Sequence, residues 1–192
     1  QGPLRQDVTL NSRLEWLLTA ELERVANRRF PERGVSEQYK RTMFGICLRF
    51  MDNRLDAEDL LQEGFVNVFK DICKFSGKGS LEGWIRTIFT RAAIDQLKAK
   101  NKILKTIELQ QDIEPMILDS DLNNPNDAEE LIIMLQKLPS GFRTVLNLYV
   151  LEDMSHDQIA KELGIAVSTS RSQLTRAKEF LKKMMLKSML LI

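Results

Sequence analysis

The sequence predicts an all-α protein of two small helical domains joined by an acidic linker, with a helix-turn-helix in the second domain. Apolar residues recur with a helical period along most of the 192 residues, and no convincing stretch alternates as a strand does. Only 9 glycines and 5 prolines interrupt this pattern. Hydrophobic residues make up 43% of the chain and charged residues 29%, which is the composition of a folded globular protein.

The same composition excludes several classes of protein. Cys47 and Cys73 lack a CxxC spacing and His156 is the single histidine, which argues against a structural zinc site and a disulfide framework. With one histidine, no Ser/His/Asp set has any weight, so the sequence does not predict an enzyme, and it implies no cofactor. No apolar run approaches the roughly 20 residues of a membrane span. We therefore expect a reduced, cytoplasmic protein that does not insert into the membrane.

Charge is strongly segregated although the net charge is only +1. Residues 56–63 hold four acids and no base, and residues 81–105 hold six bases and two acids. Between Lys105 and Lys137 there are eight acids and no base, whereas residues 165–192 hold six bases and one acid. Two basic blocks separated by an acidic one predict two anion-binding surfaces.

The first predicted domain spans residues 38–101 and contains helices over 38–51, 57–72 and 81–100. It follows an N-terminal segment, 1–37, which we expect to be divergent or partly the remnant of an engineered protease site, because the chain begins Gln-Gly-Pro. Asp56 is the predicted N-cap of the second helix, with Asp59 at the capping-box position, and Ser80 is the predicted N-cap of the third. Residues 75–80 form a basic, glycine-containing loop that favours phosphate or base contact.

The third helix of this domain has two predicted faces. Trp84 belongs to an apolar arc, and the opposite arc is polar and basic. At this level the block 56–100 is equally consistent with nucleic-acid binding and with solvated charged faces around a core. Trp84 alone favours a core position over a stacking platform.

The second predicted domain spans residues 126–192, after the linker at 102–125. Its expected helices cover 128–137, 141–151, 155–163 and 167–187. Gly164 permits a tight turn between the last two, which is the pattern of a helix-turn-helix. Side chains near the start of the fourth helix can reach base edges, and those further along suit phosphates. The alternative is an ordinary helical hairpin with a solvated basic face.

Taken in order, these blocks resemble a bacterial sigma-70 factor of the extracytoplasmic-function group, over about residues 38–185. The resemblance is carried by the run from Asp56 to Phe65, by Phe75–Ser80 with Gly83-Trp84-Ile85, by Ala93-Ile94-Asp95, by Leu138-Pro139 with Phe142-Arg143, and by the helix-turn-helix. It implies a subunit that binds core RNA polymerase, recognises the −10 and −35 promoter elements and directs initiation.

The resemblance also assigns residues to each partner. The core polymerase, through the clamp helices of its largest subunit and its flap, is the expected partner of Asp56, Asp59, Gln62, Glu63 and Phe65. Single-stranded −10 DNA would be bound by Lys78, Gly79, Ser80, Trp84, Arg86, Thr90, Arg91 and Lys98. Duplex −35 DNA would be bound by Ser168, Thr169, Arg171, Ser172, Arg176 and Lys178. An anti-sigma protein is a further implied partner, and the acidic linker would thread a basic polymerase channel.

Two other functions stay open. A stand-alone helix-turn-helix regulator would bind duplex DNA without polymerase, and an interaction module with a decayed helix-turn-helix would show no DNA preference. The acidic block at 56–65 weighs against both. The apolar tail from Met184 onward is expected either to pack on its own domain or to dock an inhibitor.

Overall fold

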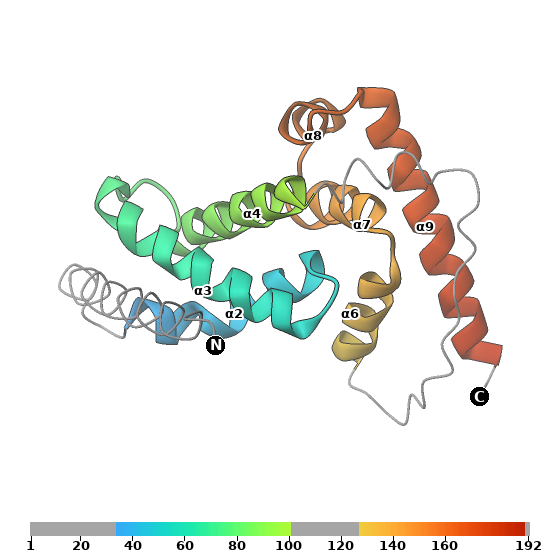
Figure 1. Cartoon of the computed structure of the whole chain (residues 1–192), viewed down its shortest axis with the longest axis horizontal. Helices are drawn as coiled ribbons and strands as arrows, with labels where there is room; N and C mark the ends of the chain where they lie inside the picture. Colours follow the sequence, from blue (N-terminus) through green and yellow to red (C-terminus); the bar gives the residue numbers. More distant parts are fainter. Residues whose placement is uncertain (1–33, 101–126, 191–192) are drawn as a thin grey trace, which may run out of the picture.

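The computed structural model describes residues 34–100 and 127–190, and every regular element there is helical, as the sequence predicts. The first group of helices is α2 (Val35–Phe50), α3 (Arg54–Asp71), the short 3-10 helix η1 (Ile72–Lys74) and α4 (Leu81–Ala99). The second group is α6 (Asp127–Lys137), α7 (Ser140–Leu146), the π-helical turn η2 (Asn147–Leu151), α8 (His156–Leu163) and α9 (Val167–Leu190). Figure 1 shows the two groups at opposite ends of the molecule, in contact at its middle. The predicted linker lies outside the described residues.

In the first group, α2, α3 and α4 pack against one another around an apolar core. Met43, Ile46, Cys47 and Phe50 are buried along one face of α2, in agreement with the predicted helical period. Burial raises the pKa of the Cys47 thiol to about 12. The loop before α4 contains Gly77 and Gly79 at φ of 77° and 83°, a left-handed conformation that glycine adopts without strain.

The start of α3 differs from the prediction. Asn53, not Asp56, is the N-cap: its Oδ1 accepts a hydrogen bond from the backbone N–H of Asp56 at 2.9 Å. Asn53 Nδ2 also donates to Asp56 Oδ2 at 3.2 Å. Asp56 therefore occupies the third position of the helix, and Asp59 is not a capping-box residue. The predicted cap of α4 is confirmed, because Ser80 Oγ accepts from Gly83 N–H at 3.3 Å.

A glycine brings α3 and α4 into close contact. A Cβ atom added to Gly64 would lie 2.2 Å from Phe89 Cε1 and 2.5 Å from Phe89 Cζ. Phe89 is fully buried, and its ring meets that of Phe65 edge to face with centroids 5.2 Å apart. The absence of a side chain at Gly64 is thus what admits the Phe89 ring between the helices.

The second group contains the predicted helix-turn-helix. Ser155 and Gln158 form a full capping box at the start of α8, with hydrogen bonds of 3.3 Å and 2.8 Å. Gly164 ends α8 at φ 68°, in the left-handed conformation of a helix C-cap. Leu174 and Ala177 of α9 face back into the core. His156 is half-buried, with Nδ1 2.9 Å from Ser170 Oγ.

The helix predicted over 141–151 is not regular to its end. It is α-helical to Leu146 and then widens into the π-helical turn η2, which the Glu152 N–H closes on the Asn147 carbonyl at 3.1 Å. The wider turn leaves Asn147 and Leu148 fully buried. The next three residues, Tyr149 to Leu151, are exposed.

The two groups share one apolar core, so the described chain is more compact than two independent domains. Helix α2 packs against both α6 and α7. Arg143 of α7 is fully buried in this contact and forms an ion pair with Asp52, the second residue after α2. Burial lowers the pKa of the Arg143 guanidinium from its ordinary value, and the hydrogen bond and charge of Asp52 oppose that shift.

Candidate functional site

The first candidate surface is the outward face of α3. Asp59, Gln62 and Glu63 are exposed there, as a face that meets a partner requires. Asp56 is half-buried, and its Oδ1 lies 2.9 Å from Lys100 Nζ at the end of α4. Phe65 is not on this face. It is 7% exposed and belongs to the core.

The packing of Phe65 explains its position. It stacks on Phe69 with ring centroids 5.9 Å apart and meets Phe89 edge to face. Its ring contacts place it in the core between α3 and α4, although it follows Gln62 by only three residues. Because Phe65 is buried, it contributes to this surface only by holding α3 in position.

Leu55 is a residue of this face that the sequence reasoning missed. Its side chain is 74% exposed, and its spacing of four and seven residues places it in line with Asp59 and Gln62. An exposed leucine next to acidic and amide side chains can serve as an apolar anchor for a partner protein. The signal was present in the sequence as an apolar residue outside the buried period of the helix.

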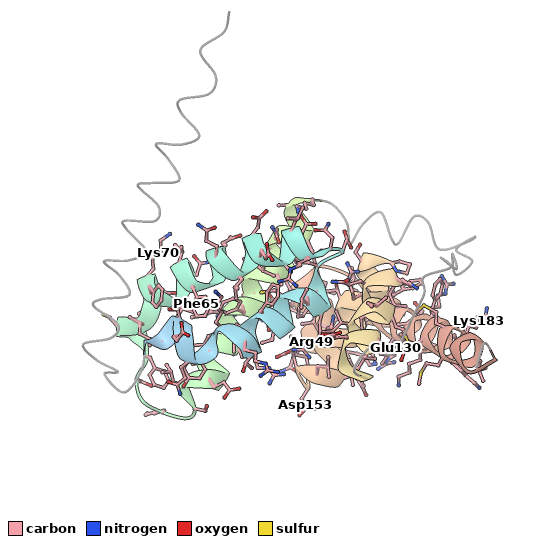
Figure 2. All side chains as sticks on the ribbon, turned by 90° about the horizontal axis from the view of Figure 1, so that it is seen from below. Arg49, Phe65, Lys70, Glu130, Asp153 and Lys183 are labelled. Atoms are coloured by element: carbon pink, nitrogen blue, oxygen red, sulfur yellow. The ribbon has the colours of Figure 1, made fainter. Side chains whose placement is uncertain are left out.

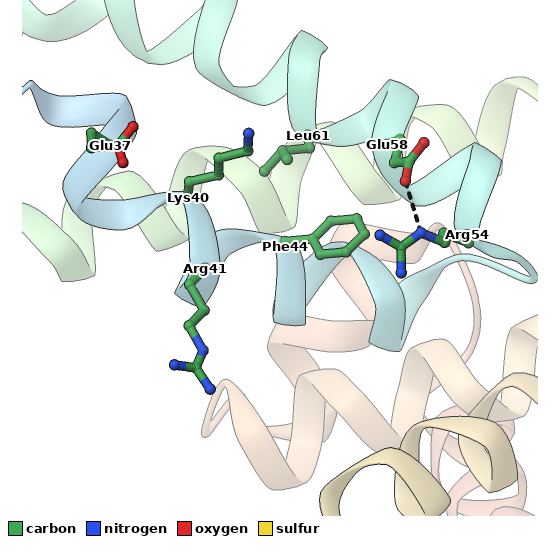
Figure 3. Close-up of a pocket in the computed structure, with 7 residues that line it drawn as sticks. All are labelled: Glu37, Lys40, Arg41, Phe44, Arg54, Glu58 and Leu61. Atoms are coloured by element: carbon green, nitrogen blue, oxygen red, sulfur yellow. Dashed lines mark hydrogen bonds and ion pairs between the residues drawn. The ribbon is translucent and has the colours of Figure 1, made fainter.

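A surface groove of about 590 Å³ adjoins this face between α2 and α3 (Figure 3). In it, Arg54 donates from Nε to Glu58 Oε1 at 2.8 Å, and its guanidinium lies 5.3 Å from the centre of the Phe44 ring. Its lining carries both signs of charge together with the apolar side chains of Phe44 and Leu61. No group of His, Cys, Asp or Glu side chains in the described part of the chain could hold a metal ion.

The second candidate surface is formed by the loop before α4 and the exposed arc of that helix. Lys78, Gly79, Ser80, Arg91 and Lys98 are exposed. Trp84 is half-buried, with its ring 5.5 Å from that of Phe75, so its side chain packs on the core and is also partly exposed.

Two residues predicted for this surface point elsewhere. Thr90 is 6% exposed, because α4 packs against both α2 and α3 and its buried arc is wider than the sequence pattern indicates. Arg86 faces the second group of helices. Its Nε donates to Glu152 Oε2 at 3.0 Å and its Nη2 donates to the Leu151 carbonyl at 3.3 Å.

The third candidate surface is the first half of α9. Ser168, Arg171, Ser172 and Lys178 are exposed, and Thr169 and Arg176 are half-exposed. Ser172 Oγ donates to the Thr169 carbonyl at 3.0 Å. Thr175, Lys182 and Lys183 are also exposed and continue this surface by helical spacing, although the sequence reasoning did not single them out. A helix with small polar residues at its start and cations along its length can enter a major groove and contact phosphates.

The comparisons with known proteins agree with this arrangement. The model of sigma-70 region 2 matches residues 35–103, and the model of sigma-70 region 4 matches residues 128–181. The chain belongs to the sigma-70 family of RNA polymerase sigma factors. Its relatives place it in the extracytoplasmic-function group, so it directs promoter recognition by RNA polymerase and is not an enzyme.

Individual relatives of this sigma factor are distant. The extracytoplasmic-function sigma factor SigE of Mycolicibacterium smegmatis is 28% identical over 152 residues, which cover 76% of this chain and 58% of the mycobacterial protein. SigW of Bacillus subtilis is 28% identical over 159 residues, covering 76% of this chain and 83% of SigW. The structure of the sigma factor RpoE from Bartonella quintana in complex with the anti-sigma factor NepR resembles this one with a TM-score of 0.45 at 18% identity, covering 91% of this chain and 95% of that one.

No helix in the described residues is both long enough and apolar enough to cross a membrane.

Proposed function

We propose that the outward face of α3 binds core RNA polymerase, with Leu55 at its N-terminal end and Asp59, Gln62 and Glu63 following along the helix. The exposure of these four side chains on one face carries this assignment. An apolar anchor beside polar groups suits a partner helix that offers a matching apolar side chain and basic residues. Asp56 has a second role, because its ion pair with Lys100 holds the start of α3 against the end of α4.

Promoter −10 DNA is bound, on this proposal, by the loop 78–80 and the exposed arc of α4. Lys78 and the backbone N–H groups at the start of α4 meet phosphates, and Arg91 and Lys98 extend the cationic track along the helix. The accessible side of Trp84 offers a platform for one unstacked base. Thr90 is left out of this surface because it is buried.

The start of α9 reads duplex −35 DNA. Ser168, Arg171 and Ser172 contact base edges in the major groove, and Arg176 and Lys178 contact phosphates. We further propose that the acidic segment 102–125 enters a basic channel of the polymerase, that an anti-sigma protein controls the factor, and that it acts in the cytoplasm.

A charge-reversal experiment tests the polymerase surface against the stand-alone regulator. The variant Asp59→Lys with Glu63→Lys is titrated against core RNA polymerase without DNA, beside a control with Glu82→Lys and Asp95→Lys. All four positions are exposed, and both variants change the charge by the same amount. We expect the α3 variant to lose binding and the α4 control to keep it. Equal binding by the two variants would refute the α3 assignment.

Run-off transcription on a library of random upstream sequences tests the function itself. Starts that appear only with this protein and share two elements at a fixed spacing support promoter recognition through both domains. Specific binding to duplex DNA by the chain alone, without polymerase binding, would instead support the stand-alone regulator.

A further inference from the structure

The C-terminal end of α9 runs past the core of its own domain. The helix is 24 residues long, or about 36 Å, and Phe180 is the last described residue along it that is buried. Beyond it, Leu181 and Met184 pack partly against the core, whereas Met185 and Leu186 are 53% and 50% exposed. Figure 1 shows this end of α9 at the periphery of the molecule, at the opposite end of the helix from α8. The domain therefore leaves apolar side chains of this helix end exposed.

The same end of α9 is basic. Glu179 is the last acidic residue in the sequence, and residues 180–192 hold nine apolar residues, three lysines and one serine. Lys182 and Lys183 are exposed, and Figure 2 shows Lys183 at the outer edge of the molecule. Cations and exposed apolar side chains thus occur together within about one turn of the helix.

The apolar residues lie on more than one side of the helix. Successive residues of an α-helix are about 100° apart, so Met185 and Leu186 lie about 100° and about 200° from Met184, which packs on the core. A groove on a partner protein covers one stripe of a helix, formed by residues three and four apart. Three apolar residues in succession are better covered by a medium that surrounds the helix end.

A lipid bilayer with negative headgroups supplies both kinds of contact. Its acyl chains take up apolar side chains from any direction, and its phosphates attract lysines, whose alkyl stems lie along the apolar boundary while the ammonium stays in water. Duplex DNA offers the phosphates without an apolar phase, and a neutral bilayer offers the apolar phase without the charge. The composition of this helix end therefore matches an anionic bilayer surface.

We propose that the C-terminal end of α9 is a peripheral membrane-binding site for anionic lipids. Met185 and Leu186 enter the boundary between headgroups and acyl chains, and Lys182 and Lys183 bind lipid phosphates. The helix lies on the bilayer and does not cross it, in agreement with the hydropathy of the described helices. This inference does not rest on the proposed function, because no residue assigned there to polymerase or promoter takes part.

Two matched double variants separate this site from the rest of the surface. Met185→Gln with Leu186→Gln removes the apolar contact and leaves the net charge unchanged. Leu131→Gln with Val150→Gln is the control, because these side chains are 51% and 53% exposed and lie on α6 and η2. Glutamine is a good helix former, and circular dichroism verifies that both variants keep the helical content of the parent.

Membrane binding is measured by flotation of the whole chain with two kinds of vesicle. One is phosphatidylcholine alone, and the other contains about one third phosphatidylglycerol. Each lysine near an anionic surface strengthens binding about fivefold, so the parent should prefer the anionic vesicles at least about tenfold. At about 1 M salt, where the Debye length is about 3 Å, this preference should disappear.

The apolar contribution is measured with the two variants on the anionic vesicles. Burial of the exposed parts of Met185 and Leu186 should strengthen binding at least about tenfold, so the α9 variant should bind more weakly than the parent by that factor. The control should match the parent. Equal binding by the parent and both variants would show that cations alone hold the vesicle, and would overturn the proposed site. Equal weakening of the two variants would overturn its place on α9.

Two further results would overturn the proposal. One is a parent protein that does not bind anionic vesicles, or binds neutral ones equally well, which would leave a protein inhibitor as the partner of this helix end. The other is sedimentation equilibrium that shows a dimeric parent and a monomeric α9 variant, because a second copy would then cover it. Binding to core polymerase, measured on the same proteins without vesicles, tests the proposed function separately.

Discussion

Replacement of Gly64 by alanine should destabilise the first domain although alanine is the better helix former. The added Cβ would lie 2.2 Å to 2.6 Å from three ring atoms of Phe89, closer than real Cβ atoms approach their neighbours. The Phe89 ring is fully buried and held against Phe65, so it cannot swing into solvent. Either α3 and α4 move apart or the ring leaves its preferred rotamer.

The magnitude follows from two opposing contributions. A glycine-to-alanine change inside a helix gains up to about 1 kcal/mol, and inserting a methyl group into a packed core costs about 1–3 kcal/mol. Gly45, in the middle of α2, provides the matched control because nothing lies within 4 Å of its added Cβ. Gly45→Ala should therefore be neutral or stabilising, and Gly64→Ala should be less stable than Gly45→Ala by about 1–3 kcal/mol.

Urea unfolding followed by circular dichroism measures both variants, with the difference taken from the transition midpoints at a common slope. The double variant Gly64→Ala with Phe89→Leu should recover part of the Gly64→Ala loss, since a smaller side chain leaves room for the methyl group. Gly64→Ala at or above the stability of Gly45→Ala would show that the close α3–α4 contact does not exist in solution.

Three further predictions concern single side chains. Leu55→Ala should weaken binding to core polymerase by about 1–2 kcal/mol in a competition titration without lowering the unfolding midpoint, because the side chain is 74% exposed; unchanged affinity would remove Leu55 from the surface. Ser155→Ala should cost about 1 kcal/mol of stability by urea unfolding, since it removes the capping box with Gln158. In the native protein at pH 8, Ellman's reagent should titrate Cys73 but not Cys47, whose pKa is raised to about 12, and urea should expose the second thiol.

The sequence was sufficient for the helices and for most of the helix-turn-helix. Burial of Met43, Ile46 and Phe50 follows from their spacing alone, and the cap at Ser80 follows from residue type and position. These features depend on interactions within a few residues along the chain. Local pattern therefore contains the information that decides them.

The predictions were wrong at two kinds of position. At one, two neighbouring residues compete to be the helix N-cap. At the other, packing buries a side chain that the helical period places on the surface. Asn53 and Asp56 are both good N-caps, and the earlier one is used because its side chain reaches the Asp56 N–H. Thr90 and Phe65 were placed on binding surfaces, yet both are buried. A helix packed on two sides buries more than the single arc that a two-faced pattern predicts.

The contact between the domains could not be predicted from the pattern of apolar and polar residues in the sequence. Its one local sign is Arg143, a cation between Phe142 and Thr144, and periodicity cannot say that its partners are the Phe50 carbonyl and Asp52. The contact also buries apolar side chains of both groups in one shared core, and which side chains meet there is not decided by the period of either helix.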